Sequence, residues 1–149
     1  MATQSRELLE SLFRAAVGAA HPSRCLPPNL PEAPPHGRLI VLAAGKGAGS
    51  LTEVAEQHYL TRIPDERLDG IAVTRHGYGR PTKLIPVVEA GHPVPDEAGL
   101  AGAEKMLTIA GGAGADDLVL VLLSGGASAN LIAPVPGISF ADKQAATRA

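Results

Sequence analysis

Aromatic residues are scarce in this chain: of its 149 residues, two are Phe, two are Tyr and none is Trp. Proteins that bind single-stranded nucleic acid stack the bases on aromatic side chains, so few candidates for such a platform exist here. The formal charge of -2 at pH 7 supplies no basic field for phosphate backbones or anionic membrane surfaces. Composition therefore argues against nucleic acid and membranes as partners.

Cysteine and long apolar runs are also nearly missing. Cys25 is the single cysteine, so the chain forms no internal disulfide and no cysteine-based zinc site, and its histidines show no metal-ligand spacing. The longest apolar runs, such as 118–123, are far too short to span a membrane. Glu7, Glu10 and Arg14 lie where a signal peptide needs apolar residues. We therefore expect a cytoplasmic protein without a metal site.

Aliphatic residues supply most of the apolar content, which is 45% of the chain. Four short runs have the length and composition of strands buried in a sheet: 38–44, 68–74, 84–88 and 118–123. Apolar residues at helical spacing predict helices over 48–59 and 96–111. Strands that alternate with helices indicate an α/β fold, a Rossmann-like, mainly parallel sheet with helices on both faces.

The two ends of the chain carry different signals. Ser5 can cap a helix whose apolar stripe needs a partner surface. The proline-rich segment 22–37 predicts a connection without regular structure. Near the other end, Ser139 and Asp142 form a capping-box pattern that opens a helix. That helix reaches Ala149 without a stop signal, so we expect a truncated domain cut within a helix; a short frayed terminal helix is the alternative.

Ligands of open parallel sheets bind beyond the carboxyl ends of the strands, where three turns carry candidate residues. The first, the Lys46 turn (45–47), combines the permissive backbone of Gly45 and Gly47 with a positive charge and a following helix, which suits an anion. It lacks P-loop spacing, and Ser50 stands where a dinucleotide fingerprint has its third glycine. A tight structural turn with an exposed lysine explains the same residues.

The Ser124 turn (124–128) follows the run 118–123. Its residues can form a nest of backbone N–H groups and hydroxyls around a phosphate or carboxylate: Ser124, Gly125, Gly126, Ala127 and Ser128. The pattern is not the G-x-S-x-G of a nucleophile elbow, because Ser124 is preceded by Leu122 and Leu123 and not by a glycine at the required spacing. A glycine-rich turn that allows close packing is the alternative interpretation.

The His92 turn (91–96) is held by two prolines. Capping of the next helix explains Asp96, whereas His92 is a candidate ligand for an anionic substrate or a structural histidine. A small basic cluster, either a solvated surface or an attractor of anions, precedes this turn: Arg75, His76, Arg80 and Lys83.

Taken in order, these segments resemble the amino-terminal part of the glycerate 2-kinase family, whose members are also labelled hydroxypyruvate reductases. The strings that carry the resemblance are Ala-Ala-Gly-Lys-Gly at 43–47, Val-Thr-Arg-His-Gly-Tyr-Gly at 73–79, Gly-His-Pro-Val-Pro-Asp-Glu-Ala-Gly at 91–99, and Leu-Ser-Gly-Gly-Ala-Ser-Ala at 123–129, which leads into 137–143.

The resemblance implies that residues 1–149 are the amino-terminal part of the first of two domains, with the active site in the cleft between them. It implies transfer of a phosphoryl group from ATP, with Mg²⁺, to the 2-hydroxyl of D-glycerate, giving 2-phosphoglycerate. Lys46 would stabilise the transferring phosphate or the glycerate carboxylate. Without its second domain, we expect the chain to be an inactive fragment whose exposed apolar edge favours a homo-oligomer.

Two other functions remain open. An NAD(P)-dependent hydroxypyruvate reductase is disfavoured by the missing third glycine, although Arg75 at a strand end would suit NADP. A non-catalytic domain that binds small anions or serves assembly is the other alternative.

Overall fold

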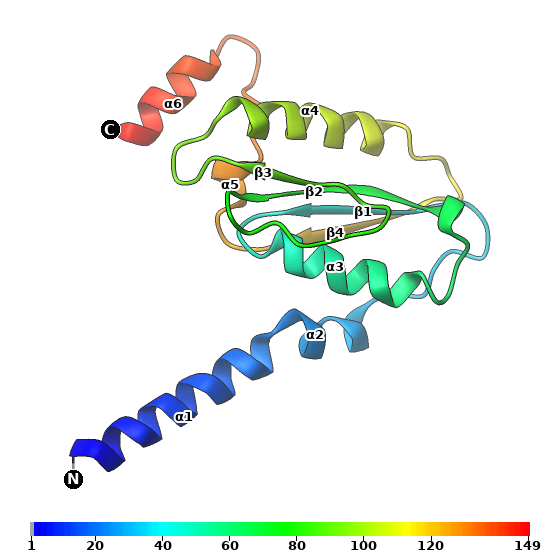
Figure 1. Ribbon diagram of the computed structural model, residues 1–149. Coiled ribbons are helices and arrows are strands. Elements are labelled where there is room, and N and C mark those ends of the chain that lie inside the picture. Colours follow the sequence, from blue (N-terminus) through cyan, green and yellow to red (C-terminus); the bar gives the residue numbers. More distant parts are fainter. Residues whose placement is uncertain (1) are drawn as a thin grey trace.

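The computed structural model describes residues 2–149 and centres on one parallel sheet (Figure 1). Its strand order is β3-β2-β1-β4, and every neighbouring pair is parallel. The strands are β1 (Leu39–Ala44), β2 (Leu68–Arg75), β3 (Val87–Ala90) and β4 (Leu118–Leu123). The predicted parallel α/β sheet is confirmed. Its order matches the first four strands of a doubly wound fold, in which strands 3, 2 and 1 form one half and strand 4 begins the other.

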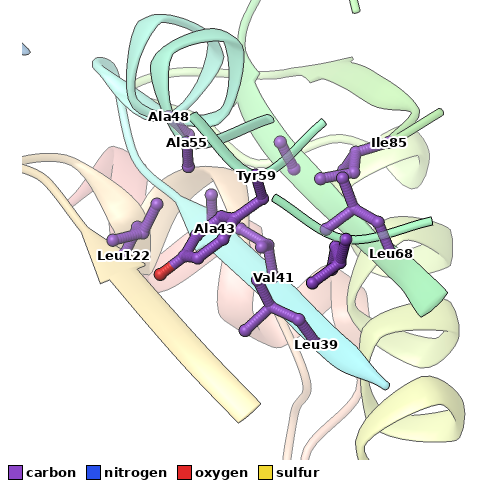
Figure 2. Close-up of a cluster of buried hydrophobic side chains, with 11 residues drawn as sticks. Leu39, Val41, Ala43, Ala48, Ala55, Tyr59, Leu68, Ile85 and Leu122 are labelled. Carbon is purple, nitrogen blue, oxygen red and sulfur yellow. The ribbon is translucent and has the colours of Figure 1, made fainter. Parts of the chain in front are cut away.

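Helices cover both faces of this sheet, as predicted (Figure 1). Side chains alternate along β1, so Leu39 and Val41 face helix α3 (Ala48–Tyr59) and Ile40 faces helix α4 (Glu97–Gly111). Figure 2 shows the α3 side, where Tyr59 lies between helix and strands. A strand with both faces buried must be apolar throughout, which explains the continuous aliphatic run.

The proline-rich segment contains regular structure, contrary to the prediction. Helix α2 (Pro22–Cys25) and a 3₁₀ turn, η1 (Pro27–Asn29), occupy its first half. Proline is tolerated at the first helical position because the N–H it lacks has no partner there in any helix. The hydroxyl of the buried Tyr59 donates to the carbonyl of Pro31 at 2.7 Å, which fastens the second half of the segment to α3.

Helix α1 (Ala2–Ala20) begins before Ser5, so Ser5 is not its cap and that prediction was wrong. The helix projects away from the sheet (Figure 1), and its apolar stripe stays exposed, with Leu9 at 66% and Phe13 at 70% of full exposure. No helix among residues 2–149 is both long enough and apolar enough to cross a membrane.

The third strand starts at Val87 and not at Leu84, as the sequence had suggested. The reason is Glu56 on α3, which is only 3% exposed. Its carboxylate accepts hydrogen bonds from three successive amides, those of Lys83, Leu84 and Ile85, at 2.5, 2.8 and 2.8 Å. These amides are therefore not available for pairing with β2, and pairing begins only beyond them.

This buried carboxylate leads to a stability prediction. Glu56→Gln replaces one acceptor oxygen by an NH₂ group that faces amide donors, so we expect a loss of roughly 2 to 3 kcal/mol in unfolding free energy. Urea unfolding followed by circular dichroism measures it. The matched control is Glu53→Gln on the same helix, whose carboxylate has no hydrogen bond among the described residues and should change stability by less than about 0.5 kcal/mol. Equal effects of the two variants would contradict the structural role of Glu56.

The remaining elements follow β4 or connect the others. They are a short turn η2 (Asp65–Arg67), helix α5 (Ala127–Asn130) and helix α6 (Phe140–Arg148). The predicted capping box of α6 is confirmed, because the Ser139 hydroxyl accepts from the Asp142 amide and the Asp142 carboxylate accepts from the Ser139 amide. Asp96 also caps α4 as predicted, by accepting from the Gly99 amide.

Candidate functional site

The strand order brings two of the candidate turns together. From β1 the chain builds outward through β2 and β3, and it then returns to add β4 on the other side of β1. The carboxyl ends of β1 and β4 are therefore adjacent where the direction of winding reverses, which is the usual ligand site of open α/β sheets. The Lys46 turn follows β1 and the Ser124 turn follows β4, so both lie at this point.

Hydrogen bonds join these two turns directly. The Lys46 amide donates to the Gly125 carbonyl at 2.9 Å, and the Gly47 amide donates to the Ser124 hydroxyl at 2.8 Å. Gly45 has φ +108°, and a Cβ atom there would lie 2.3 Å from the Ser124 carbonyl oxygen. Only glycine permits this approach, so the glycine next to the lysine has a definite steric cause.

The His92 turn completes the cluster. Gly126 has φ +91°, and a Cβ atom there would lie 2.8 Å from Nε2 of His92 and 3.1 Å from Cγ of Lys46. The Lys46 and His92 side chains therefore both lie against Gly126. The three turns meet at one place, although they are far apart in the sequence.

Not every predicted residue belongs to this cluster. Ala127 and Ser128 lie in helix α5, and Ser128 is exposed and lines a separate pocket of about 210 Å³ beside Ile132 and Lys143. A wider pocket of about 590 Å³ lies near the carboxyl end of α3, between it and the proline-rich segment, at the opposite edge of the sheet. The cluster is thus formed by Gly45, Lys46, Gly47, Ser124, Gly125, Gly126 and His92.

Asp96 fixes the position of the His92 turn. Its carboxylate accepts from the Gly99 amide at 3.0 Å, contacts Nε2 of His76 at 2.8 Å and lies close to Gly91, where a Cβ atom would be 3.2 Å from its carboxyl carbon. Partial burial opposes ionisation of Asp96, but these hydrogen bonds outweigh it and lower the pKa of the carboxyl. Asp96 therefore closes the turn as well as capping α4, and the sequence had shown only the capping.

Asn130 is a further residue that sequence reasoning missed. It is fully buried, and its side-chain amide donates to the Gly91 carbonyl at 3.1 Å. This bond ties the segment after β4 to the His92 turn. The available signal was a single polar residue in an otherwise small and apolar stretch, 129–137. Such a residue is expected to have a hydrogen-bond partner when buried.

Charge at the cluster is positive. The Lys46 side chain is exposed, and in the part of the chain that the structure describes no carboxylate lies within ion-pair distance of it. An ammonium group beside glycine-rich turns can hold a phosphate or a carboxylate. Residues 2–149 contain no group of three or more His, Cys, Asp or Glu side chains placed to hold a metal ion.

Comparison with known proteins identifies the family of the chain. Residues 8–149 match the family described as Domain of unknown function (DUF4147). The chain belongs to this family. A relative from Agrobacterium vitis, named "Putative hydroxypyruvate reductase", is 40% identical over 145 residues, which are 97% of this chain and 32% of the relative. The DUF4147 chain thus spans about a third of that relative's length.

Two further relatives of this DUF4147 chain carry kinase names. A "Glycerate 2-kinase" of Pyrococcus horikoshii is 42% identical over 111 residues, covering 74% of this chain and 24% of the relative. The crystal structure of a Thermotoga maritima glycerate kinase superposes with a TM-score of 0.76 at 28% identity, covering 94% of this chain and 33% of that one. The predicted fold and the predicted family are both confirmed.

Proposed function

We propose that this chain supplies the anion-binding part of a kinase that transfers the γ-phosphoryl group of ATP to the 2-hydroxyl of D-glycerate, giving 2-phosphoglycerate. The observation that carries the proposal is the meeting of Lys46, which has no ion-pair partner among residues 2–149, with the glycine-rich Ser124 turn at the switch point of the sheet. Relatives named glycerate kinase support it. ATP and glycerate are both anions of the kind that this cluster suits.

The residues of the cluster fit phosphate or carboxylate oxygens. The space above Gly126 would be filled by any Cβ atom, so its glycine leaves room between Lys46 and His92. Phosphoryl transfer depends mainly on positioning and on neutralising charge, and Lys46 would supply the positive charge. Mg²⁺ binds chiefly to phosphate oxygens, water and one or two carboxylates, and no residue of the described chain is assigned to it.

A reductase is the second candidate. Arg75 lies at the end of β2, where a Rossmann fold can place a cation for the 2′-phosphate of NADP, and the Agrobacterium vitis relative carries a reductase name. Against it, Ser50 replaces the third glycine of the dinucleotide fingerprint. A non-catalytic domain that binds small anions would bind glycerate or ATP and form no product.

The test is turnover by the full-length gene product. We expect 2-phosphoglycerate to form from ATP and D-glycerate, with no change in NADPH absorbance when hydroxypyruvate is added. NADPH consumption without phosphoglycerate formation would replace the kinase by the reductase. Calorimetric binding of glycerate and ATP with neither reaction would leave an anion-binding domain.

A further inference from the structure

Tyr78 is an exposed aromatic side chain on a rigid loop at the same edge of the sheet. It is 48% exposed, in a chain that has only two Tyr and two Phe. The Tyr78 loop (76–80) follows β2 directly. On both sides of Tyr78 the backbone is held by Glu89 of β3, whose carboxylate accepts from the amides of Gly77 and Gly79 at 2.9 and 2.8 Å. These two bonds lower the pKa of Glu89, so the side chain that holds the two amides is an ionised carboxylate.

The base of the loop is also anchored. The His76 amide donates to the Ala90 carbonyl at 3.1 Å. The His76 ring contacts Asp96 at 2.8 Å and lies 3.9 Å from Glu89. The loop is thus tied to β3 and to the N-cap residue of α4, and it presents Tyr78 in a defined position. An aromatic ring fixed in place loses little conformational entropy when a ligand binds it.

The loop lies next to the Lys46 turn. A Cβ atom on Gly49, in the first turn of α3, would lie 2.6 Å from the Tyr78 carbonyl oxygen. Arg80 donates from Nε to the Ser50 hydroxyl at 3.3 Å, one residue further along the same helix. A pocket of about 260 Å³ lies here, lined by Ser50, Gly77, Tyr78, Gly79 and Arg80. The Tyr78 loop therefore borders the first turn of α3, the helix that follows the Lys46 turn directly.

The chemistry of the Tyr78 ring favours a flat, aromatic ligand. The Arg75 guanidinium carbon lies over one face of the ring, 4.4 Å from its centroid, in a cation–π contact, so a ligand can stack only on the other face. Glycerate has no planar ring that could stack, whereas the base of a nucleotide does. We propose that Tyr78 is the stacking platform for the adenine base of the nucleotide whose phosphates lie at Lys46. The inference rests on the proposed function for the position of the phosphates.

Adenine can come from ATP or from NADPH, so the experiment includes both. We compare dissociation constants of the full-length gene product for ATP, NADPH and inorganic tripolyphosphate, which has phosphates but no base. Tyr78→Ala should weaken ATP binding about 10-fold or more, the usual loss when an aromatic partner of a base is removed. Tripolyphosphate binding should stay unchanged, and Tyr78→Phe should restore the affinity for ATP. Phe13→Ala, which removes an exposed ring on α1, is the matched control.

Each outcome decides the proposal. If Tyr78→Ala leaves the affinity for ATP unchanged, the proposal that Tyr78 stacks on the base is wrong. If Lys46→Ala still weakens ATP binding in that case, the proposed kinase function stands. An equal loss for ATP and tripolyphosphate also overturns stacking by Tyr78, because the substitution then acts on the phosphate site and not on a base. Selective weakening of NADPH binding would support the platform and contradict the kinase. Absence of binding of either nucleotide by the unsubstituted protein overturns both proposals.

Discussion

Lys46→Ala should lower kcat/KM of the full-length gene product for ATP and glycerate by about 10² to 10³, the usual loss when one well-placed electrostatic group is removed. The melting temperature should hardly change. The Lys46 side chain is exposed and has no ion-pair partner among residues 2–149, and substitutions at such positions change stability by no more than about 0.5 kcal/mol. Steady-state kinetics and thermal unfolding of the same preparation measure both quantities.

Two further variants sharpen this test. Lys46→Arg should restore activity only in part, because the planar guanidinium is bulkier than an ammonium and Cγ of residue 46 already lies close to Gly126. Lys105→Ala on the exposed side of α4 is the matched control, which removes the same charge away from the switch point. If Lys46→Ala retains nearly normal kcat/KM for both substrates, the Lys46 turn has only a structural role, and the anion must bind at the Ser124 turn.

Gly45→Ala should cause a large loss of stability, roughly 3 kcal/mol or more, and should also disrupt the anion site. A residue with a side chain at φ +108° is strained by about 1 to 3 kcal/mol. The added Cβ would also overlap with the Ser124 carbonyl oxygen, at 2.3 Å, so the Ser124 turn must move. Urea unfolding of the full-length gene product measures the first effect, and its calorimetric titration with ATP measures the second.

Gly77→Ala is the control for Gly45→Ala. Gly77 also has a positive φ, +79°, but a Cβ atom there would meet nothing within 4 Å. Only the backbone strain remains, so the expected loss is about 1 to 2 kcal/mol. Similar losses for the two variants would show that the contact between the Lys46 and Ser124 turns does not require glycine, contrary to the geometry described above.

Periodicity predicted most of the fold. The run 118–123 became β4 with the predicted bounds, and the caps at Asp96 and Ser139 mark the starts of α4 and α6. Such signals are local, because a strand's composition or a helix cap depends on a few neighbouring residues. The errors have local causes too. α1 begins before Ser5, and proline at the first position of α2 is compatible with a helix, contrary to the prediction.

The start of the third strand shows the limit of local reasoning. Leu84 and Ile85 have strand-like composition, but their amides donate to Glu56, which lies 28 and 29 residues away in the sequence. No periodicity within the segment can reveal a partner on another helix. Asn130 was missed for the same reason, since its bond to Gly91 spans 39 residues.

By itself, the sequence determined the α/β class, the positions of the turns after the strands and the residue types they carry, because these depend on burial pattern and on the conformational freedom of glycine. Tertiary structure alone decided that β4 lies beside β1, and hence that Lys46 and Ser124 meet. It also decided that His92, after β3, reaches Gly126 of the Ser124 turn and that Ser128 faces another pocket. The physical reason is that strand order follows from packing between distant segments, and a binding site forms where the ends of adjacent strands bring their turns together.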